Sequence, residues 1–191
     1  MKPRKPLKIT SRTSSVTNGF VQAILPDVPI SMVEFEQGLA ALGQKPSSPR
    51  TCVYCGAPST DSDHFKPLVS KKRPSGYLNE ARNLVPACGT CNQSKSGQNW
   101  RVWMTGRAAG SPQMRGVTDV EQRIAALERF EKWAGAEPRD FAALVGEDLW
   151  QLYWARLDEI ERLMHAAQAE AEIIKAKLSL GLKASATNAQ V

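Results

Sequence analysis

The chain has 191 residues, of which 42% are hydrophobic and 23% are charged. This length and composition predict one packed domain with helical additions, and they exclude a large multidomain machine, a disordered chain and a collagen-like chain. The charge is uneven, because the residues up to Arg115 contain 16 Lys and Arg against 6 Asp and Glu, and the rest contain 9 against 13. A basic first part is typical of proteins that bind a polyanion, although a solvated basic surface gives the same count.

The sequence contains no membrane-spanning or exported segment that we can identify. A membrane helix needs about 18 consecutive apolar residues, and the chain has no such run. The apolar stretch after the basic N-terminus covers only Val21 to Leu25 and is followed by Pro26 and Pro29, which is too short for an export signal. We therefore expect no membrane partner and a cytoplasmic protein.

The N-terminal region is expected to have two parts. Residues 1–18 carry basic side chains among Ser, Thr and Pro without apolar periodicity, which predicts a flexible basic arm that either follows a phosphate backbone or acts as a solubilising tail. Residues 19–49 are expected to be a helical segment. Its helix begins with a capping box formed by Ser31 and Glu34, ends at Gly43, and buries a stripe of apolar side chains, namely Phe35, Leu39 and Leu42.

The C-terminal region follows a segment rich in Gly, Ser and Pro, residues 107–117, which predicts a linker. In the region 118–191 we expect only helices. Thr118 and Glu121 form a second capping box, opening a helix that stops near Gly135 and buries Ile124, Leu127 and Phe130. A short helix is expected over residues 138–145.

The last predicted helix runs from Glu147 to about Leu180, where Gly181 supplies a C-terminal stop. Its apolar residues recur at spacings of four and three, which places them on one seam of a heptad repeat. The seam consists of Tyr153, Leu157, Ile160, Met164, Ala167, Ala171, Ile174 and Leu178. Such a seam packs either on the protein's own core or on a second copy of the helix, so a homodimer is one of two expectations.

Four cysteines form two Cys-x-x-Cys pairs, Cys52 with Cys55 and Cys88 with Cys91. Two residues between the cysteines let both sulfurs of a pair face one ion. Thiols of an intracellular chain stay reduced, which favours a metal over the alternatives of disulfide bonds or a redox pair. Four thiolates leave no ligand position for water, so we expect a structural zinc ion.

A series of polar motif residues lies between and just after the Cys pairs. In chain order these are Asp63-His64-Phe65-Lys66-Pro67, Gly76, Asn83-Leu84, Asn92 and Lys95. An Asp-His pair alone is weak evidence, since a hydrogen-bonded histidine in a small core gives the same pattern. Together with the Cys pairs, the order of these motifs resembles the HNH endonuclease family, and the resemblance covers the segment from Cys52 to Lys95.

The resemblance implies a fold and a site. Residues 50–106 would form an α+β core of the ββα-metal type with the four-cysteine zinc site, flanked by an N-terminal helix and a helical C-terminal extension. Asp63 and Asn92 would hold one divalent ion, His64 would be the general base, and Asn83 would fix a loop and orient His64. The family often has His where this chain has Asn92, and a neutral amide oxygen favours Mg²⁺ or Mn²⁺ over zinc or nickel.

The resemblance also implies a DNA substrate. Seven basic residues in or near the motif are candidates for contacts to the phosphate backbone: Lys66, Lys71, Lys72, Arg73, Arg82, Lys95 and Arg101. The expected function is metal-dependent hydrolysis of DNA by an HNH endonuclease of a restriction, homing or phage-associated kind. The alternatives are a zinc-stabilised DNA-binding module without turnover, and a helical adaptor. Trp100 and Trp103 are expected to be buried rather than to stack on bases.

Overall fold

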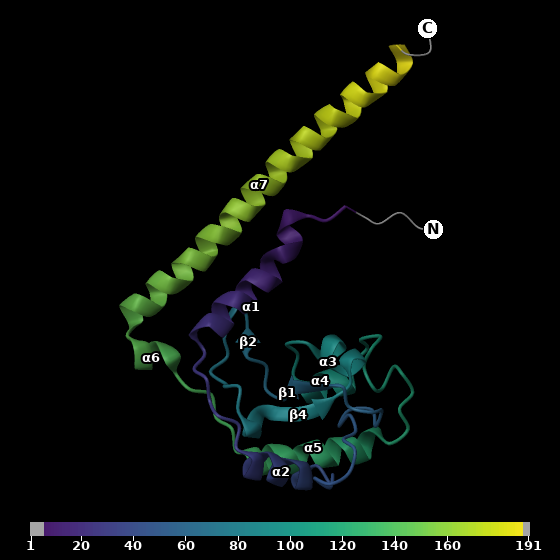
Figure 1. The fold of residues 1–191 in the computed structure, drawn as a ribbon, viewed down its shortest axis with the longest axis vertical. Helices are drawn as coiled ribbons and strands as arrows, with labels where there is room; N and C mark the ends of the chain where they lie inside the picture. The colour runs from purple at the N-terminus through teal and green to yellow at the C-terminus, as the bar shows by residue number, and fades with distance from the viewer. Residues whose placement is uncertain (1–5, 189–191) are drawn as a thin grey trace. The chain divides into compact units, whose positions relative to one another are not determined.

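The computed structural model describes the backbone of residues 6–188 and the side chains of residues 6–182. The chain divides into two compact units, which are described one at a time. One unit comprises residues 23–141. The other combines the residues up to Gln22 with those from Ala142 onward, so it is built from both ends of the chain. Figure 1 labels the helices and strands in chain order.

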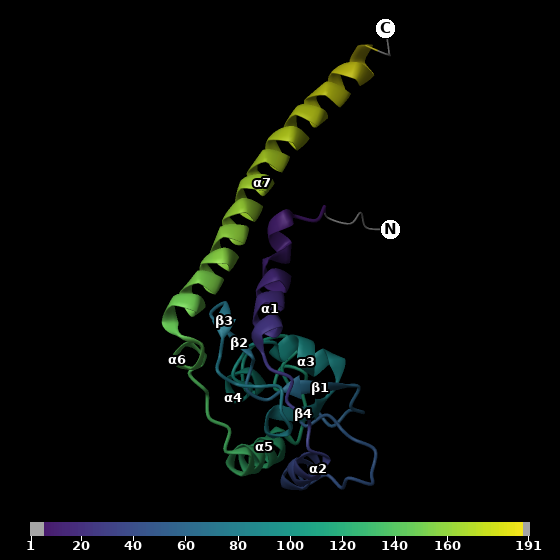
Figure 2. The same cartoon turned by 60° about the vertical axis from the view of Figure 1, so that its left-hand side comes forward.

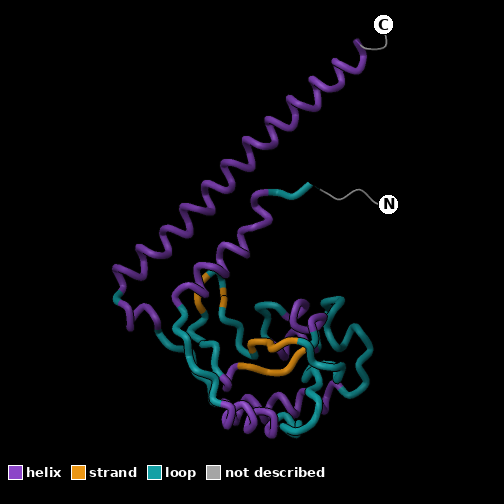
Figure 3. The backbone as a smooth tube through the Cα atoms, in the orientation of Figure 1, coloured by secondary structure: helices purple, strands orange, loops and turns teal. Residues whose placement is uncertain are grey.

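At the centre of the first unit two strands pair and a helix follows. Strand β1 (Asp61–His64) runs antiparallel to β4 (Leu84–Ala87), with Asp63 opposite Val85 and His64 opposite Leu84. Helix α3 (Gly89–Lys95) begins directly after β4, and Figure 3 shows the two strands side by side. All four residues of β4 are buried. This α+β arrangement of two strands and one helix confirms the fold predicted from the sequence.

A small hairpin lies between the two central strands in the sequence. Strands β2 (Val69–Ser70) and β3 (Arg73–Pro74) pair antiparallel, and the turn between them is formed by Lys71 and Lys72. Both turn residues have positive φ, 48° and 63°, as the tight turns of two-residue hairpins require. The turn therefore projects two exposed lysines at the tip of the hairpin. The short helix η2 (Ala81–Asn83) then leads into β4.

Aromatic side chains form the core of this unit. Phe65, directly after β1, stacks on Trp100 of helix α4 (Trp100–Met104) at a centroid distance of 5.4 Å and meets Phe130 edge-on at 5.2 Å. Phe130 belongs to helix α5 (Val120–Ala134), which contributes Ile124 and Leu127 to the same core. Trp100 and Trp103 are each 1% exposed, so the prediction that both are buried is confirmed.

The helix ends of this unit agree with the sequence at two places and differ at one. Helix α2 (Met32–Ala41) begins as predicted, because the hydroxyl of Ser31 accepts a hydrogen bond from the backbone N–H of Glu34 at 3.3 Å. The second capping box is wrong, since α5 takes Asp119 as its N-terminal cap residue and Asp119 binds Arg123 of the next turn at 2.7 Å. Gly135 ends α5 in the left-handed region, at φ 53°, as predicted. The short helix α6 covers Phe141–Val145.

The segment predicted as a linker, residues 107–117, is folded. Ser111 is fully buried, and its hydroxyl donates a hydrogen bond to the carbonyl of Gly106 at 2.8 Å and accepts one from the N–H of Met114 at 3.3 Å. The carbonyl of Ser111 also accepts from the N–H of Arg115 at 3.0 Å. A composition of Gly, Ser and Pro suits such a series of tight turns, whose backbone groups bind one another, as well as a linker.

The second unit pairs the N-terminal helices with the first part of the long helix α7 (Glu147–Asn188), as Figure 2 shows for α1. Residues 9–24 form η1 (Ile9–Arg12) and α1 (Thr13–Ile24). Tyr153 of α7 donates a hydrogen bond to the carbonyl of Phe20 at 2.9 Å, and their rings lie 5.1 Å apart. The predicted flexible arm, residues 1–18, is helical from residue 9 onward, where Thr17 is buried and the N–H of Ile9 donates to Oε1 of Gln168 at 2.6 Å. Residues 1–5 lie outside the described part.

Helix α7 differs from its prediction in length and in packing. It continues through Gly181 to Asn188, because a glycine in a helix costs only about 1 kcal/mol and does not oblige the helix to end. The predicted seam is packed only in part. Leu157 is fully buried and Met164 half-buried, whereas Ile174 and Leu178 are 58% and 62% exposed. None of the helices in residues 6–188 combines the length and apolarity needed to cross a membrane.

The packing of α7 on α1 predicts a difference between two leucines on the same helix. Leu157→Ala should lower the free energy of unfolding by about 2–5 kcal/mol, because it leaves a cavity at a fully buried position. Leu163→Ala, the same change at a 52% exposed position, should lower it by less than about 1 kcal/mol. Chemical denaturation followed by circular dichroism measures both, and equal losses would contradict the packing described here.

Candidate functional site

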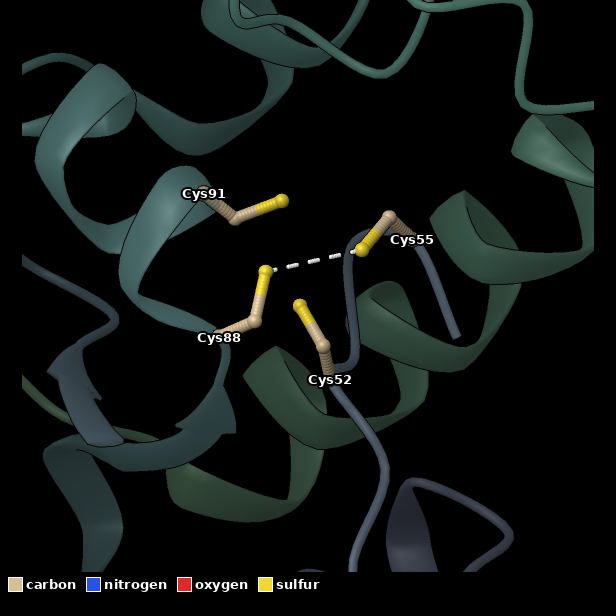
Figure 4. A group of neighbouring side chains, drawn as sticks. All are labelled: Cys52, Cys55, Cys88 and Cys91. Carbon is tan, nitrogen blue, oxygen red and sulfur yellow. Dashed lines mark hydrogen bonds between the residues drawn. The ribbon is translucent and has the colours of Figure 1, made fainter. Parts of the chain in front are cut away.

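The four cysteine sulfurs lie together between the turn before β1 and the start of α3. Their sulfur atoms are all within 4.8 Å of one another, and Sγ of Cys55 is 3.7 Å from Sγ of Cys88 (Figure 4). A tetrahedral zinc site with Zn–S bonds of about 2.3 Å places its sulfurs about 3.8 Å apart. All four cysteines are free. They are therefore positioned to hold one metal ion, as the Cys-x-x-Cys spacing predicts.

The loop that carries Cys52 and Cys55 is shaped by its backbone. The N–H of Cys52 donates to the carbonyl of Ala57 at 2.7 Å, and the N–H of Gly56 donates to the carbonyl of Cys52 at 2.8 Å. Gly56 has a φ of 78°, and a Cβ there would lie 2.3 Å from Nη2 of Arg123. The same guanidinium donates to the carbonyl of Cys52 at 3.3 Å. The positive φ of this turn favours glycine, and a Cβ there would oblige the end of the Arg123 side chain to shift.

The thiols of this cluster influence each other's ionisation. The hydrogen bond from Cys91 lowers the pKa of Cys52 to about 5, although burial opposes this change. The pKa of Cys91 is raised in turn, because its thiol donates to Cys52 and is itself buried. Four thiolates this close repel one another unless a cation lies among them. The donor set therefore fits a thiophilic divalent ion, whose binding would release the remaining thiol protons.

Asp63 of β1 is held by two buried hydrogen-bond donors. Its Oδ2 accepts from the hydroxyl of Tyr54 at 2.6 Å and from Nζ of Lys95 at 2.9 Å. Nζ of Lys95 also donates to the carbonyl of His64 at 2.8 Å. Tyr54 lies between the first two cysteines and Lys95 lies in α3. These contacts connect the metal-binding loop, the central strand and the helix at one carboxylate.

The three side chains of this network, Tyr54, Asp63 and Lys95, are almost completely buried, at 0%, 4% and 0% exposed. Burial, followed by the charge of Asp63, raises the pKa of Tyr54 well above its usual value, so its hydroxyl stays a donor. A buried ion pair is tolerated only when each charge is compensated and hydrogen-bonded. Among the described residues, Oδ1 of Asp63 accepts no hydrogen bond, which leaves one oxygen that could bind a cation.

His64 is half-buried and its ring is bound by a residue that the sequence motifs do not include. Nε2 of His64 lies 3.0 Å from Oδ1 of Asn79. Burial lowers the pKa of His64 below 6.5, opposed by Asn79 and by the charge of Asp63. The imidazole is therefore neutral at pH 7. Because an amide oxygen only accepts hydrogen bonds, Nε2 carries the proton and Nδ1 keeps a lone pair that can accept another.

Asn83 fixes a loop, but it does not orient His64. The side chain of Asn83 is fully buried, and its Oδ1 accepts from the N–H of Lys66 at 2.7 Å. Its Nδ2 donates to the carbonyls of Lys66 and Leu78, each at 3.0 Å. The expectation that Asn83 orients His64 is corrected, because the imidazole donates its hydrogen bond to Oδ1 of Asn79.

Asn92 lies in α3, three residues before Lys95 and on the same face of the helix. That face is turned toward β1, since Lys95 reaches Asp63 from it. Asp61 of β1 is a further carboxylate on this side: its Oδ2 lies 3.4 Å from where a Cβ on Gly89 would be. Carboxylate and amide oxygens are ligands that suit Mg²⁺ or Mn²⁺. Among the described residues, the four cysteines are the one group of three or more His, Cys, Asp or Glu side chains whose ligand atoms lie close enough together to share an ion.

The seven basic residues predicted to contact DNA do not form one group. Four of them pair with carboxylates in the first unit: Lys66 with Glu131, Arg82 with Glu34, Lys95 with Asp63, and Arg101 with Glu128. The other three, Lys71, Lys72 and Arg73, lie in the β2–β3 hairpin. Lys71 and Lys72 are exposed at its turn.

Sequence reasoning missed Tyr54, Asn79 and Asp61. Tyr54 could have been found from the sequence, because it has a polar hydroxyl and lies between two candidate metal ligands. Asp61 could also have been found, because residues two apart on a strand share a face and Asp61 is two residues before Asp63. Asn79 could not, since its contact with His64 depends on how the loop between β3 and η2 folds back.

Comparison with known proteins agrees with this geometry. Residues 52–98 match the model of the HNH endonuclease family. This segment is an HNH domain. It includes all four cysteines, Asp63, His64 and Asn92, and it leaves the helices α1, α2, α5 and α7 unmatched.

One relative matches beyond the HNH domain. The chain is 30% identical over 111 residues to the CRISPR-associated endonuclease Cas9 of Corynebacterium diphtheriae. The match covers 56% of this chain and 9% of the Cas9 protein, so the chain corresponds to a small part of that relative. No solved structure matches the chain significantly.

Cys88 belongs to the cysteine cluster and His64 of β1 does not, so substitutions of the two residues should have different effects. Cys88→Ser should lose both bound zinc and the folded state of the HNH domain, because zinc binding contributes on the order of 10 kcal/mol to folding in small zinc domains. His64→Ala should keep both, since His64 is not part of the thiolate cluster. Zinc content per chain and thermal melting measure the two properties. Loss of zinc in His64→Ala with retention in Cys88→Ser would contradict this assignment.

Proposed function

We propose that the chain is a metal-dependent endonuclease that hydrolyses phosphodiester bonds of DNA. The proposal rests above all on the adjacent pair Asp63 and His64 on β1, held between the thiolate cluster and α3 within an HNH domain. A carboxylate with one oxygen available and a neutral imidazole on the next residue are the two groups that water activation on a phosphate needs. The shared segment with a CRISPR-associated endonuclease supports the same reaction class.

The four cysteines would hold zinc in a structural role. A closed shell of four thiolates leaves no ligand position for water or substrate, so its contribution is to folding. Tyr54 lies between the two cysteines of the first pair, and its hydroxyl donates a 2.6 Å hydrogen bond to Asp63. This hydrogen bond would help to fix the position of strand β1 relative to the zinc site.

Asp63 and Asn92 would hold the second ion, Mg²⁺ or Mn²⁺, with Asp61 as a further carboxylate within the same face of β1. When bound, such an ion would stabilise the negative charge that develops on the departing 3′ oxygen and orient the scissile phosphate. Nδ1 of His64 would accept the proton of the attacking water, and Asn79 would hold the ring by Nε2. The expected products carry 5′-phosphate and 3′-hydroxyl ends.

Cleavage of supercoiled plasmid tests the proposed nuclease function. Wild-type protein with Mg²⁺ should nick the plasmid, and EDTA should stop the reaction. His64→Ala should lower the rate by about 100-fold or more, because a positioned general base contributes about 10²–10⁴ to the rate. His165→Ala removes the other histidine, an exposed residue of α7, and should cleave like the wild type. Equal cleavage by His64→Ala and the wild type would refute the assignment of the base.

A second candidate function is a DNA-binding module without turnover. It is favoured by the buried ion pair between Lys95 and Asp63, since the Lys95 ammonium already neutralises the carboxylate that a catalytic ion would need. The plasmid experiment separates the two functions. DNA retention at low salt by both wild type and His64→Ala, with no cleavage in Mg²⁺ or Mn²⁺, would select the binding module.

For DNA contacts we propose the β2–β3 hairpin as the main basic element. Lys71 and Lys72 are exposed at its turn, whereas Lys66 and Arg82 are half-buried. A side chain that neutralises a phosphate releases counterions, and each such contact steepens the salt dependence of log K by about 0.9. The exposed hairpin lysines would therefore contribute more to backbone binding than the half-buried residues.

The hairpin proposal predicts a change in salt dependence. Changing Lys71 and Lys72 together to Gln should weaken DNA binding and lower the slope of log K against log salt by about 1.8, if both contact phosphates. A control variant that changes the exposed Lys45 and Lys132 to Gln removes the same charge elsewhere on the first unit. Binding measured by fluorescence anisotropy at several salt concentrations gives both slopes. Identical slopes in the two variants would rule the hairpin out.

A further inference from the structure

The segment 107–117 lies outside the stretch that matches the HNH family, yet one of its side chains reaches the thiolate cluster. Nη1 of Arg115 donates a hydrogen bond to Sγ of Cys91 at 3.2 Å. The two residues are separated by 24 positions in the chain. Neither the Cys-x-x-Cys spacing nor the HNH motif assigns a role to this arginine.

The loop that carries Arg115 is built to hold it there. The backbone N–H of Arg115 donates to the carbonyl of the fully buried Ser111 at 3.0 Å. Gly110 packs so closely on α3 that a Cβ would lie 2.4 Å from the hydroxyl of Ser94. Ser94 is itself fixed, because it accepts a hydrogen bond from the indole of Trp103 at 3.0 Å. The loop is therefore packed against the same helix that supplies Cys91.

The negative charge of a four-thiolate site explains why a contact between Arg115 and Cys91 would be favourable. One divalent ion bound by four thiolates leaves two net negative charges, and Cys52 and Cys91 are both completely shielded from solvent. Charges removed from water need hydrogen-bond donors or opposite charges to compensate them. A guanidinium is permanently cationic, and its hydrogen bonds to anions are stronger than those between neutral groups. Arg115 supplies both the donor and the positive charge at one sulfur.

We propose that Arg115 is a positioning residue of the metal site: it compensates the charge of the Cys91 thiolate and thereby strengthens the binding of zinc to the four cysteines. The inference rests on the zinc binding proposed above and is independent of nuclease activity. It also gives the loop 107–117 a function, which is to complete a metal site whose ligands all precede it in the sequence.

Zinc affinity in three variants tests the proposal. Arg115→Gln removes the charge, Arg115→Lys keeps it without the planar donor geometry, and Arg107→Gln removes an exposed charge from the same loop. Affinity is measured by competition with a chromophoric chelator, and circular dichroism at saturating zinc checks the fold. Arg115→Gln should bind zinc about 10–100-fold more weakly, the range found when partners of metal ligands are removed. Arg115→Lys should recover part of this loss, and Arg107→Gln should match the wild type.

A second readout follows the sulfur itself. In the zinc-loaded protein, alkylation of Cys91 by iodoacetamide should be faster in Arg115→Gln than in the wild type, because weaker zinc binding exposes more free thiolate. Wild-type affinity in Arg115→Gln would overturn the proposal, and so would an equal loss in Arg107→Gln. If the wild-type protein binds no zinc at all, the metal assignment of the cysteines fails, and the inference about Arg115 fails with it.

Discussion

Four sulfur atoms within 4.8 Å of one another impose the constraint on which the HNH domain depends. As thiolates they would repel one another, so a bound cation, and the donors around it, would compensate the charge and favour the folded domain. The loop before β1 and the start of α3 meet at this cluster, and the strands between them are thereby held as a pair. Arg123 and Arg115, both outside the family match, add backbone and sulfur contacts to the same centre.

The second feature of the domain is the connection from this cluster to Asp63. Tyr54 and Lys95 bind the same carboxylate oxygen from two different elements, and both are buried. Hydrogen bonds between buried groups are electrostatically stronger than hydrogen bonds in water, and they restrict the motion of the groups that make them. The position of Asp63, and of His64 beside it, is thus fixed by the same packing that brings the sulfurs together.

Composition alone does not show how many basic side chains are engaged in ion pairs. The first part of the chain is strongly basic, but three of its basic residues form ion pairs with glutamates of helices α5 and α2. These residues are Lys66, Arg82 and Arg101, and their partners lie far from them in the sequence. Lys95 is fully buried beside Asp63. At the turn of the β2–β3 hairpin, Lys71 and Lys72 are exposed, and both have positive φ values.

The sequence by itself determined what depends on residues close in the chain. The Cys-x-x-Cys spacing predicted a shared ion, Ser31 and Gly135 marked helix ends, and the order of motif residues gave the ββα core. Only the tertiary structure decided which partner binds His64, which carboxylate neutralises Lys95, and that a Gly- and Ser-rich segment carries Arg115 to a sulfur. These contacts join residues that lie apart in the chain, such as Asp63 and Lys95. No local pattern of hydrophobicity, capping or composition encodes them, because they are set by how the elements pack.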